Sequence, residues 1–407
     1  MCYDPLRAYT RGAATSYQTE SERGMRITGI TTFLVDATPP GGWGGGGRNW
    51  LFVRVDTDEG ISGIGEASGW PRVIQTAIDD LSVVVVGEDP CRIERLWQKM
   101  LLAIMGHGMT GVVGAGAMTG IEIACWDILG KKLGVPVCDL LGGRVRDSVR
   151  VYGHAGNAQR AQELVGRGYT ALKCGGPHNP VPTVRAVRRA VGDDVDVCVD
   201  VHGPPWFTVP DAIRVGQELE EYDILFYEDP VAPENEEALA RVAEAVNVPV
   251  SAGERHATIY GFRNLIERDI VDVIHPDTGR AGGLLQMKKI AAQAESHFIQ
   301  MAPHDGSNGP VAEAAAVQLM AAIPNFLILE HLADDVPQRY KVATELKVVD
   351  SHIAVPTAPG LGIELNEEAC RAHPGGQNVG RVNQQVLDAT YVQARSRRRR
   401  LMGREEG

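Results

Sequence analysis

The spacing of apolar residues changes near residue 149 and divides the chain into two parts. In the first part, alternating apolar and polar residues predict strands at 26–36 and 50–57, and the turn TDEG leads into a third run, ISGIGEA. Helical periodicity follows over three segments, at about 71–86, 90–103 and 113–132. We expect these elements to form a small α+β domain.

In the second part, short apolar runs alternate with helix-length amphipathic segments. The runs are VRVYGH (149–154), TALKCG (170–175), VCVDVH (197–202), ILFYED (224–229), VPVSAGE (248–254), VDVIHPD (271–277), FIQMAPH (298–304) and FLILEH (326–331). They start roughly 21 to 28 residues apart, which leaves room for one helix between successive strands. Strands that alternate with helices pair in parallel, and eight such units can close into a barrel. The pattern therefore predicts an α/β fold with a (β/α)8-type barrel and an α+β capping domain.

The third run shows which side chains face the barrel interior. In VDVCVDVH, four valines alternate with Asp196, Cys198, Asp200 and His202. Side chains alternate across a strand, so the valines are expected to face the helices and the other set to face inward. Asp200 and His202 would then lie on one inward face, about 7 Å apart along the strand.

Acidic residues end three consecutive runs, at Asp200, Glu228 and Glu254. Catalytic residues of this architecture lie at the carboxyl ends of the strands, where these three would be neighbours. Converging carboxylates repel each other unless a cation holds them. Hard oxygen ligands without a Cys or His trio indicate Mg²⁺ rather than zinc. A solvated or salt-bridged loop acid is the alternative for any single member of the trio.

Asp277 and His304 end the sixth and seventh runs and form a candidate dyad. A carboxylate that accepts from one imidazole nitrogen raises the basicity of the other, so His304 is a candidate general base. His202 is a candidate general acid, with a hydrogen-bonded imidazole at the barrel rim as the alternative. Lys173 can neutralise a substrate carboxylate unless it is a surface lysine. Glu330 can hydrogen-bond a developing oxyanion if its pKa is raised, or it is a loop acid.

Composition excludes several classes of protein. The 407 residues are 44% hydrophobic and 23% charged, which is typical of a globular protein, and the net charge of -12 argues against a nucleic-acid partner. No apolar run is expected to span a bilayer, and no signal-peptide pattern is found, so we expect no membrane partner. The seven cysteines form no CxxC pair, and their odd number favours free thiols in a reducing cytoplasm.

The domain boundaries follow from these patterns. Residues 1–24 are polar and aperiodic, and the glycine-rich loop 41–47, which carries Trp43, can either close over a ligand or remain a mobile surface loop. The basic run RSRRRR near the C-terminus is interpreted as a solvated tail, with a nucleic-acid arm as the alternative. The predicted parts are an extension at 1–24, a capping domain at 25–145, a barrel at 146–345, a return to the capping domain at 346–390 and a basic tail at 391–407.

The ordered combination of motifs resembles the enolase superfamily, specifically its mandelate racemase subgroup, over about residues 25–370. The matching positions are Asp200, Glu228 in YEDP, Glu254 in SAGE, the Asp277/His304 pair and Glu330, together with IEIACWDILGKKLGVP...LLGG (121–143) and the APGLGIE run. This resemblance implies that the trio binds Mg²⁺ and that the dyad supplies a base. It also implies a symmetric homo-oligomer.

The chain departs from the racemase pattern at the end of the second barrel strand. The subgroup usually carries K-x-K there, with the second Lys as a base, whereas this chain has Lys173-Cys174-Gly175. Racemisation needs a base on each face of the α-carbon, so one base is missing. The Asp200-x-His202 pattern instead resembles acid-sugar dehydratases of the galactonate dehydratase kind, which pair a strand-three His with the strand-seven His.

The favoured hypothesis is therefore a Mg²⁺-dependent acid-sugar dehydratase, a hydro-lyase acting on a small sugar acid. Mg²⁺ and Lys173 would bind the substrate carboxylate, and His304 would remove the α-proton to form an enediolate. His202 would protonate the departing 3-hydroxyl, giving a 2-keto-3-deoxy acid. The alternatives are an epimerase or cycloisomerase that uses the same enediolate, and a binding or regulatory protein without turnover.

Overall fold

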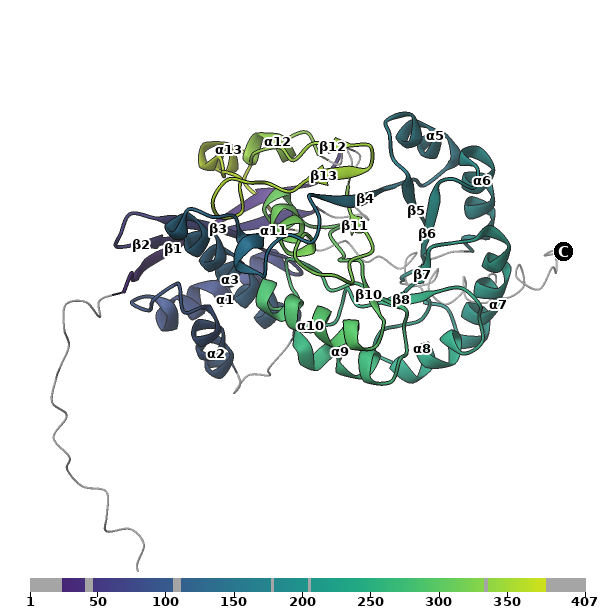
Figure 1. Ribbon diagram of the computed structural model, residues 1–407, viewed down its shortest axis with the longest axis horizontal. Helices are drawn as coiled ribbons and strands as arrows, with labels where there is room; N and C mark the ends of the chain where they lie inside the picture. The colour runs from purple at the N-terminus through teal and green to yellow at the C-terminus, as the bar shows by residue number, and fades with distance from the viewer. Residues whose placement is uncertain are drawn as a thin grey trace, which may run out of the picture.

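The computed structural model describes residues 24–40, 47–104, 111–176, 179–203, 206–332 and 336–377, which form a barrel with a smaller domain on one side (Figure 1). Most of the predicted N-terminal extension and glycine-rich loop, the last part of the predicted return and the whole basic tail lie outside these described residues. The (β/α)8-type barrel with an α+β cap confirms the predicted fold class.

The capping domain is built on a three-stranded antiparallel sheet in the order β1-β2-β3. The strands are β1 (Ile27–Asp36), β2 (Asn49–Thr57) and β3 (Ser62–Ala67), and the helices that follow are α1 (Pro71–Val85), α2 (Ile93–Ile104) and α3 (Val112–Leu133). Glycines let α3 lie close against β3, since a Cβ on Gly65 would stand 2.0 Å from the carbonyl oxygen of Gly120. The three helices predicted from periodicity are therefore present within a few residues of their expected ends.

Helix α3 corrects one expectation about membrane-spanning length. Among the described helices it alone is long and apolar enough to cross a bilayer, although no such run was expected. However, 78% of its apolar window is buried inside the protein, where it packs on the sheet and on α1 and α2. It is therefore a core helix of the capping domain.

Eight parallel strands form the barrel, and helices surround them (Figure 1). The strands are β4 (Ser148–His154), β5 (Ala171–Gly175), β6 (Asp196–Asp200), β7 (Phe226–Glu228), β8 (Val250–Ala252), β9 (Val273–Ile274), β10 (Gln300–Met301) and β11 (Leu329–Glu330). The helices are α5 (Ala158–Gly166), α6 (Val181–Val191), α7 (Val209–Leu219), α8 (Glu236–Ala243), α9 (Thr258–Glu267), α10 (Leu284–Ser296) and α11 (Pro310–Met320). The barrel closes because β11 pairs with β4 and Met301 of β10 bridges to Phe326, just before β11.

A separate apolar cluster fills the barrel below the strand ends. Its buried members come from seven different strands or their edges: Tyr152, Ala171, Cys198, Phe226, Val273, Ala302 and Ile328. Val197 and Val199 belong instead to the large core outside the barrel strands. The predicted alternation along the third barrel strand is therefore confirmed, with Cys198 inward and the valines outward.

Two buried carboxylates of the capping domain bind the amino ends of barrel helices. Glu66 of β3 accepts hydrogen bonds from the amides of Gly309 and Ala312 at the start of α11. Glu122 of α3 accepts from the first two amides of α10, at 2.8 and 2.9 Å. Carboxylates are favourable there because the helix dipole and the unpaired amides both attract an anion. These contacts hold the capping domain against the first turns of α10 and α11, the helices that follow β9 and β10 in the barrel.

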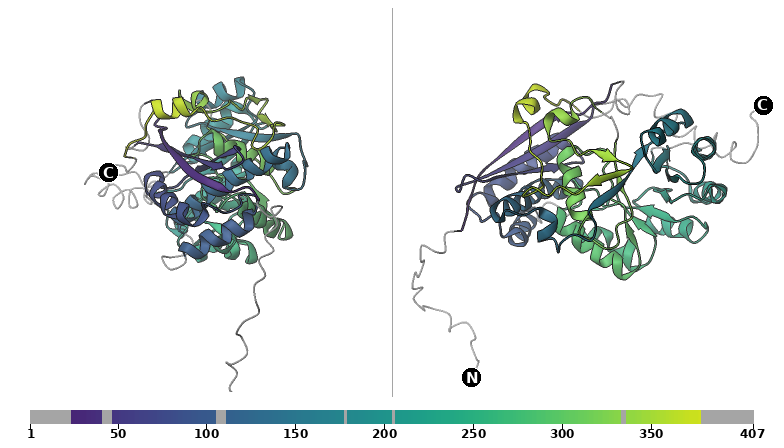
Figure 2. Two further views of the ribbon diagram at one scale, coloured as in Figure 1. Left: turned by 90° about the vertical axis from the view of Figure 1, so that its left-hand side faces the viewer. Right: turned by 45° about the horizontal axis from the view of Figure 1, so that its top comes forward.

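The chain after the barrel returns to both parts of the molecule (Figure 2). It contains α12 (Arg339–Val342), β12 (Val348–Val349), β13 (His352–Ala354) and α13 (Glu367–Ala372). Strand β13 pairs antiparallel with β4 on the barrel, whereas Glu367 of α13 pairs with Arg54 of β2. Pro374 forms a bridge with Val35 of β1. This segment therefore ties the two parts together a second time.

We predict that the Glu66→Gln variant gains stability relative to wild type as the pH rises. Burial raises the pKa of Glu66 from its ordinary value of 4.5 to about 7, despite the opposing effect of its amide partners. Between pH 4.5 and about pH 7, Glu66 is therefore protonated in the folded state and ionised in the unfolded state. The free energy of unfolding of the wild type thus falls as the pH rises through this range. Gln has no such dependence, so the stability difference between variant and wild type should shift by on the order of 3 kcal/mol in favour of Gln.

Chemical denaturation at pH 5 and pH 8 measures this shift. The exposed control Glu295→Gln, on α10, changes no buried charge. A Glu66→Gln difference that stays the same at both pH values would contradict the prediction.

Candidate active site

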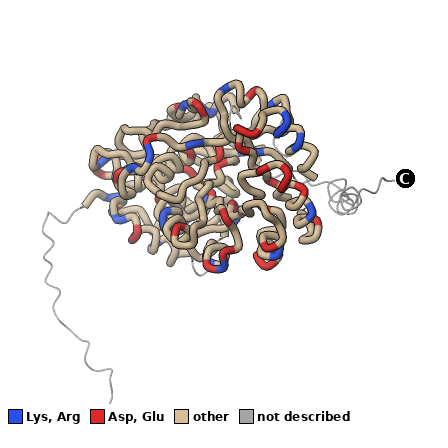
Figure 3. Tube along the Cα trace, turned by 45° about the vertical axis from the view of Figure 1, so that its right-hand side comes forward, with Lys and Arg blue, Asp and Glu red and all other residues tan. Residues whose placement is uncertain are grey.

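The barrel strands bring the predicted site residues to one end. Lys173 lies in β5, Asp200 and Glu228 end β6 and β7, Glu330 ends β11, and Glu254, Asp277 and His304 follow β8, β9 and β10. In the parallel register, Asp200 stands beside Glu228. Figure 3 shows acidic positions, in red, in the interior of the molecule as well as at its periphery. The seven site side chains named above are all buried.

Lys173 stands among three carboxylates. Its Nζ lies 3.1 Å from Asp200 Oδ2, 2.9 Å from Glu228 Oε2 and 2.9 Å from Glu330 Oε1. Burial alone would lower the pKa of Lys173, but these anions raise it well above its usual value. Of these contacts, the one to Glu228 is a hydrogen bond donated by the ammonium, and those to Asp200 and Glu330 are ion pairs. The alternative of a surface lysine is thereby excluded.

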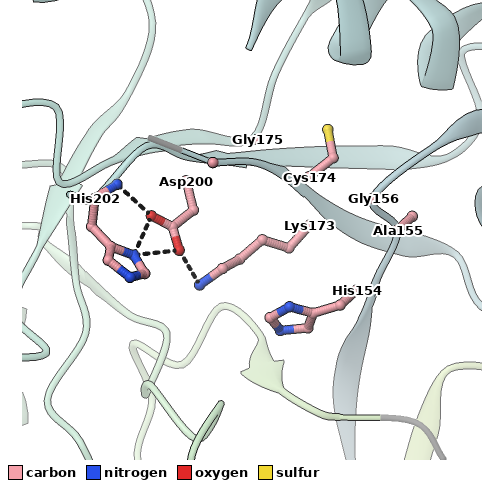
Figure 4. A pocket seen from close by; sticks show the side chains of 9 residues that line it. His154, Ala155, Gly156, Lys173, Cys174, Gly175, Asp200 and His202 are labelled. Carbon is pink, nitrogen blue, oxygen red and sulfur yellow. Dashed lines mark hydrogen bonds and ion pairs between the residues drawn. The ribbon is translucent and has the colours of Figure 1, made fainter. Parts of the chain in front are cut away.

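His202 and Asp200 are in direct contact and line the same cavity. Strand β6 ends at Asp200, and beyond it His202 Nδ1 lies 2.9 Å from Asp200 Oδ1, while the backbone amide of His202 donates to the same oxygen at 3.0 Å (Figure 4). The hydrogen bond to Asp200 is the main cause that raises the pKa of His202 to about 9. The imidazole remains partly exposed, at 42%, and faces the cavity.

Asp277 and His304 form the predicted pair. His304 Nδ1 lies 2.6 Å from Asp277 Oδ2, and its Nε2 lies 3.1 Å from Glu254 Oε2. Burial disfavours the charged imidazole, but Glu254, Glu330 and Asp277 together raise the pKa of His304 to about 10. Nε2, the atom that would accept a proton from a substrate, therefore already contacts Glu254.

Asp277 is held by groups from both parts of the fold. Its Oδ1 accepts from Ser68 Oγ and Gly279 N, both at 2.8 Å, and from Asn308 Nδ2 at 3.2 Å. Its Oδ2 also lies 3.2 Å from a guanidinium nitrogen of Arg280. Ser68 follows β3, so a capping-domain side chain directly contacts the acid of the dyad. No sequence pattern indicated Ser68, because its partner is more than two hundred residues away.

Glu330 differs from its expected state. The predicted role as a hydrogen-bond donor required a raised pKa, but the pKa of Glu330 is lowered well below its usual value. Burial acts in the opposite direction, and Lys173, His304 and His154 outweigh it. In addition, Glu330 Oε2 accepts from the amides of Asp305 and Gly306 at 2.8 and 2.7 Å. In this arrangement Glu330 is therefore an acceptor that orients its neighbours, and a donor role towards an oxyanion stays a prediction.

Three further residues of the site did not emerge from the sequence. His154 ends β4 and contacts Glu330, Arg280 lies beside Asp277 and Glu254, and Asp229 lies next to Glu228. His154 is the last residue of the run VRVYGH, so the rule that identified the other strand ends could have found it. Arg280 lies in the loop after β9, where no periodicity indicates a position.

Two adjoining cavities open at this end of the barrel. One has a volume of about 330 Å³ and reaches Glu254, Arg280, His304 and Glu330. The other, of about 320 Å³, extends towards Ala155, Gly156, Cys174, Gly175 and Gly176 (Figure 4). Both are lined by His154, Lys173, Asp200 and His202.

Gly175 explains the departure from the racemase pattern in structural terms. Its φ is +137°, a conformation that side-chain-bearing residues rarely adopt. A Cβ at this position would also lie 2.1 Å from the carbonyl oxygen of Asp200. The backbone therefore has no room for the second lysine of a K-x-K motif.

The trio of carboxylates fits a divalent metal in its chemistry. Asp200, Glu228 and Glu254 offer hard oxygen donors from adjacent strands, and Asp200 and Glu228 share one ammonium partner. Asp229 Oδ2 is buried nearby without a hydrogen-bond partner among the described residues. Within those residues, however, no group of three or more potential ligands is already close enough to hold an ion. To bind a metal ion, Asp200 and Glu228 would have to release Lys173, and Glu254 would have to release His304.

Comparisons with known proteins agree with this fold. Residues 46–142 match the family model for the mandelate racemase/muconate lactonizing enzyme N-terminal domain, and residues 157–369 match the enolase C-terminal domain-like model. A crystal structure of a mandelate racemase/muconate lactonizing enzyme-like protein from Roseovarius sp. TM1035 is 36% identical, with a TM-score of 0.80, over 88% of this chain and 98% of that one.

Characterised relatives cover almost the whole chain. The D-xylonate dehydratase of Haloferax volcanii is 35% identical over 91% of this chain and 95% of its own. The D-galactonate dehydratase of Ralstonia pickettii is 34% identical over 84% of this chain and 93% of its own. The chain therefore belongs to the mandelate racemase/muconate lactonizing enzyme family of the enolase superfamily.

Proposed function

We propose that this protein is a divalent-metal-dependent acid-sugar dehydratase, a hydro-lyase that converts a sugar acid into a 2-keto-3-deoxy acid. The observation that carries the proposal is the pair of imidazoles held by carboxylates, His304 on Asp277 and His202 on Asp200, which line one cavity with Lys173. Dehydration needs one base and one acid, and this site offers one candidate for each. The relatives named as D-xylonate and D-galactonate dehydratases support the same reaction class.

The proton transfers follow from the positions of the two imidazoles. His304 Nε2 takes the proton from C2, next to the substrate carboxylate, while Asp277 holds Nδ1. His202 gives a proton to the hydroxyl on C3, which leaves as water as the C2–C3 double bond forms. The resulting enol gains a proton at C3 and becomes the 2-keto acid. No second base is needed on the opposite face of C2, which agrees with glycine at position 175.

Lys173 is proposed to bind the substrate carboxylate. In the structure its ammonium donates to Glu228 and is ion-paired with Asp200 and Glu330. Asp200, Glu228 and Glu254 would hold Mg²⁺, and the ammonium of Lys173 would then be free to bind the substrate carboxylate. Bound Mg²⁺ would supply Lewis-acid stabilisation of the negative charge that develops on the substrate carboxylate. The symmetric homo-oligomer and the cytoplasmic location remain predictions.

His304→Asn should remove both dehydration and exchange of the C2 proton, with kcat/KM reduced by roughly 10³-fold or more, because the base is lost. His202→Asn should lose dehydration but retain exchange of the C2 proton in deuterated water. The assay screens a stereochemically complete set of aldonic acids with Mg²⁺ and detects keto acid and, by NMR, deuterium at C2.

The matched control for this experiment is His297→Asn. His297 is also an imidazole paired with a carboxylate, Asp269 at 2.8 Å, but it lies at the C-terminal end of α10 and lines neither cavity. Full turnover in His304→Asn would exclude it as the base. Epimerisation or isomerisation without keto-acid release would favour the alternative enzyme class, and binding without any turnover would favour a regulatory protein.

Lys173→Met should destabilise the metal-free protein and should be rescued in part by Mg²⁺. Without the ammonium, three buried carboxylates lose their counter-charge, a change that typically costs about 3–5 kcal/mol. A cation shared by Asp200 and Glu228 would restore much of that compensation. Melting temperatures of wild type and variant are compared in EDTA and in saturating Mg²⁺. If the gap between the two proteins is equal in both conditions, the shared role of these carboxylates is wrong.

Ser68→Ala should lower kcat by roughly tenfold with little change in KM, because a hydrogen bond to a charged group is worth about 1.5–3 kcal/mol. Ser68 touches Asp277, not the cavity, so the effect should act through the orientation of His304. Ser68→Thr keeps the hydroxyl and is expected to restore most of the activity. An equal loss in the Ala and Thr variants would instead indicate a general packing defect.

A further inference from the structure

His154 is a third imidazole of the site, and the proposed proton transfers do not use it. It ends β4, directly beside Lys173 of β5 in the parallel register. Its Nε2 lies 2.8 Å from Glu330 Oε1, and 35% of the side chain is exposed. The ring lines both cavities, and Figure 4 shows it on the other side of Lys173 from His202.

Glu330 determines which nitrogen of His154 carries the hydrogen. Glu330 Oε1 is ion-paired with the Lys173 ammonium at 2.9 Å, and Oε2 accepts from two backbone amides. Neither oxygen has a proton to donate, so the imidazole must donate from Nε2. In the neutral ring, Nδ1 is then a bare acceptor. Within the part of the chain that the structure describes, no hydrogen bond to His154 Nδ1 is found.

The cavity beside His154 is kept open by residues with small side chains. Ala155, Gly156, Gly175 and Gly176 line the 320 Å³ cavity but not the neighbouring one. A Cβ on Gly175 would collide with the backbone of Asp200, so this position of the cavity wall stays without a side chain. The 330 Å³ cavity instead contains His304 and Glu254, where C1 to C3 of the substrate would react. A longer carbon chain must continue from there into neighbouring space.

We propose that the 320 Å³ side cavity holds the substrate carbons beyond C3 and that His154 Nδ1 accepts a hydrogen bond from one of their hydroxyl groups. His154 is then a specificity-determining residue, held in its tautomer by Glu330. This inference rests on the proposed dehydratase function and names the part of the sugar acid that the enzyme reads. A substrate without that hydroxyl leaves a desolvated acceptor unpaired, which enzymes typically penalise strongly.

The test is a cycle of enzyme variants and substrate analogues. The aldonic acid with the highest kcat/KM is compared with its analogues lacking the 4-hydroxyl or the 5-hydroxyl, with Mg²⁺ present. Wild type should lose on the order of 100-fold in kcat/KM with one of the analogues. In His154→Ala, the parent acid and that analogue should be used about equally well. His154→Asn, which keeps an acceptor oxygen near the position of Nδ1, should restore part of the discrimination.

A second variant tests the space itself. A Cβ on Gly156 meets nothing within 4 Å, so Gly156→Leu adds bulk without a backbone collision. It should lower kcat/KM for five- and six-carbon acids at least tenfold more than for a four-carbon acid. Gly261→Ala, on α9 outside both cavities, is the control, because its Cβ would make only ordinary contacts.

The outcomes separate this inference from the proposed function. If no aldonic acid is dehydrated by wild type, both fail. If dehydration occurs but His154→Ala slows the parent acid and every deoxy analogue by the same factor, or leaves all of them unchanged, only the role of His154 is wrong. If Gly156→Leu lowered kcat/KM by the same factor for short and long acids, the side cavity would be excluded as the binding site of the carbon chain.

Discussion

The ammonium group of Lys173 is the counter-charge on which the arrangement of the site depends. Asp200, Glu228 and Glu330 come from three strands and would repel each other in a buried space, where charges are poorly screened. One nitrogen within 3.1 Å of all three makes their convergence possible without a metal. The same ammonium fixes Glu330 as an anion, and Glu330 in turn orients His154. The protein can therefore fold around its acidic centre before any cation binds.

The capping domain contributes more than a cover for the barrel. Its buried Glu66 and Glu122 bind the first turns of α11 and α10, and Ser68 reaches the dyad itself. The loop that carries Asp277 is thus held on one side by β9 and on the other by the end of β3. Because these contacts are buried, a small displacement of the capping domain would be transmitted to His304. The two structural parts consequently behave as one catalytic unit.

Strand register explains what could be predicted from the sequence. An apolar run that ends in an acid or a histidine predicts a functional side chain at the carboxyl end of a strand, even when the positions of the helices are not known accurately. This rule located Asp200, Glu228 and His304. The rule did not predict the direct contact between the imidazole of His202, which lies beyond the end of β6, and the carboxylate of Asp200. It could not give the protonation of Glu330, which depends on partners from three other segments. The rule could not identify Ser68, because only the tertiary fold brings this residue into contact with Asp277.

The bare Cα of Gly175 also restricts how the activity of this enzyme could change over evolutionary time. A side chain there would meet the carbonyl oxygen of Asp200, whose own carboxylate belongs to the proposed metal site. Any single mutation that introduces a lysine at this position must therefore displace the strand that supports the existing activity. The backbone conformation at Gly175 therefore disfavours a second base at this position, whichever residues occupy the other catalytic positions.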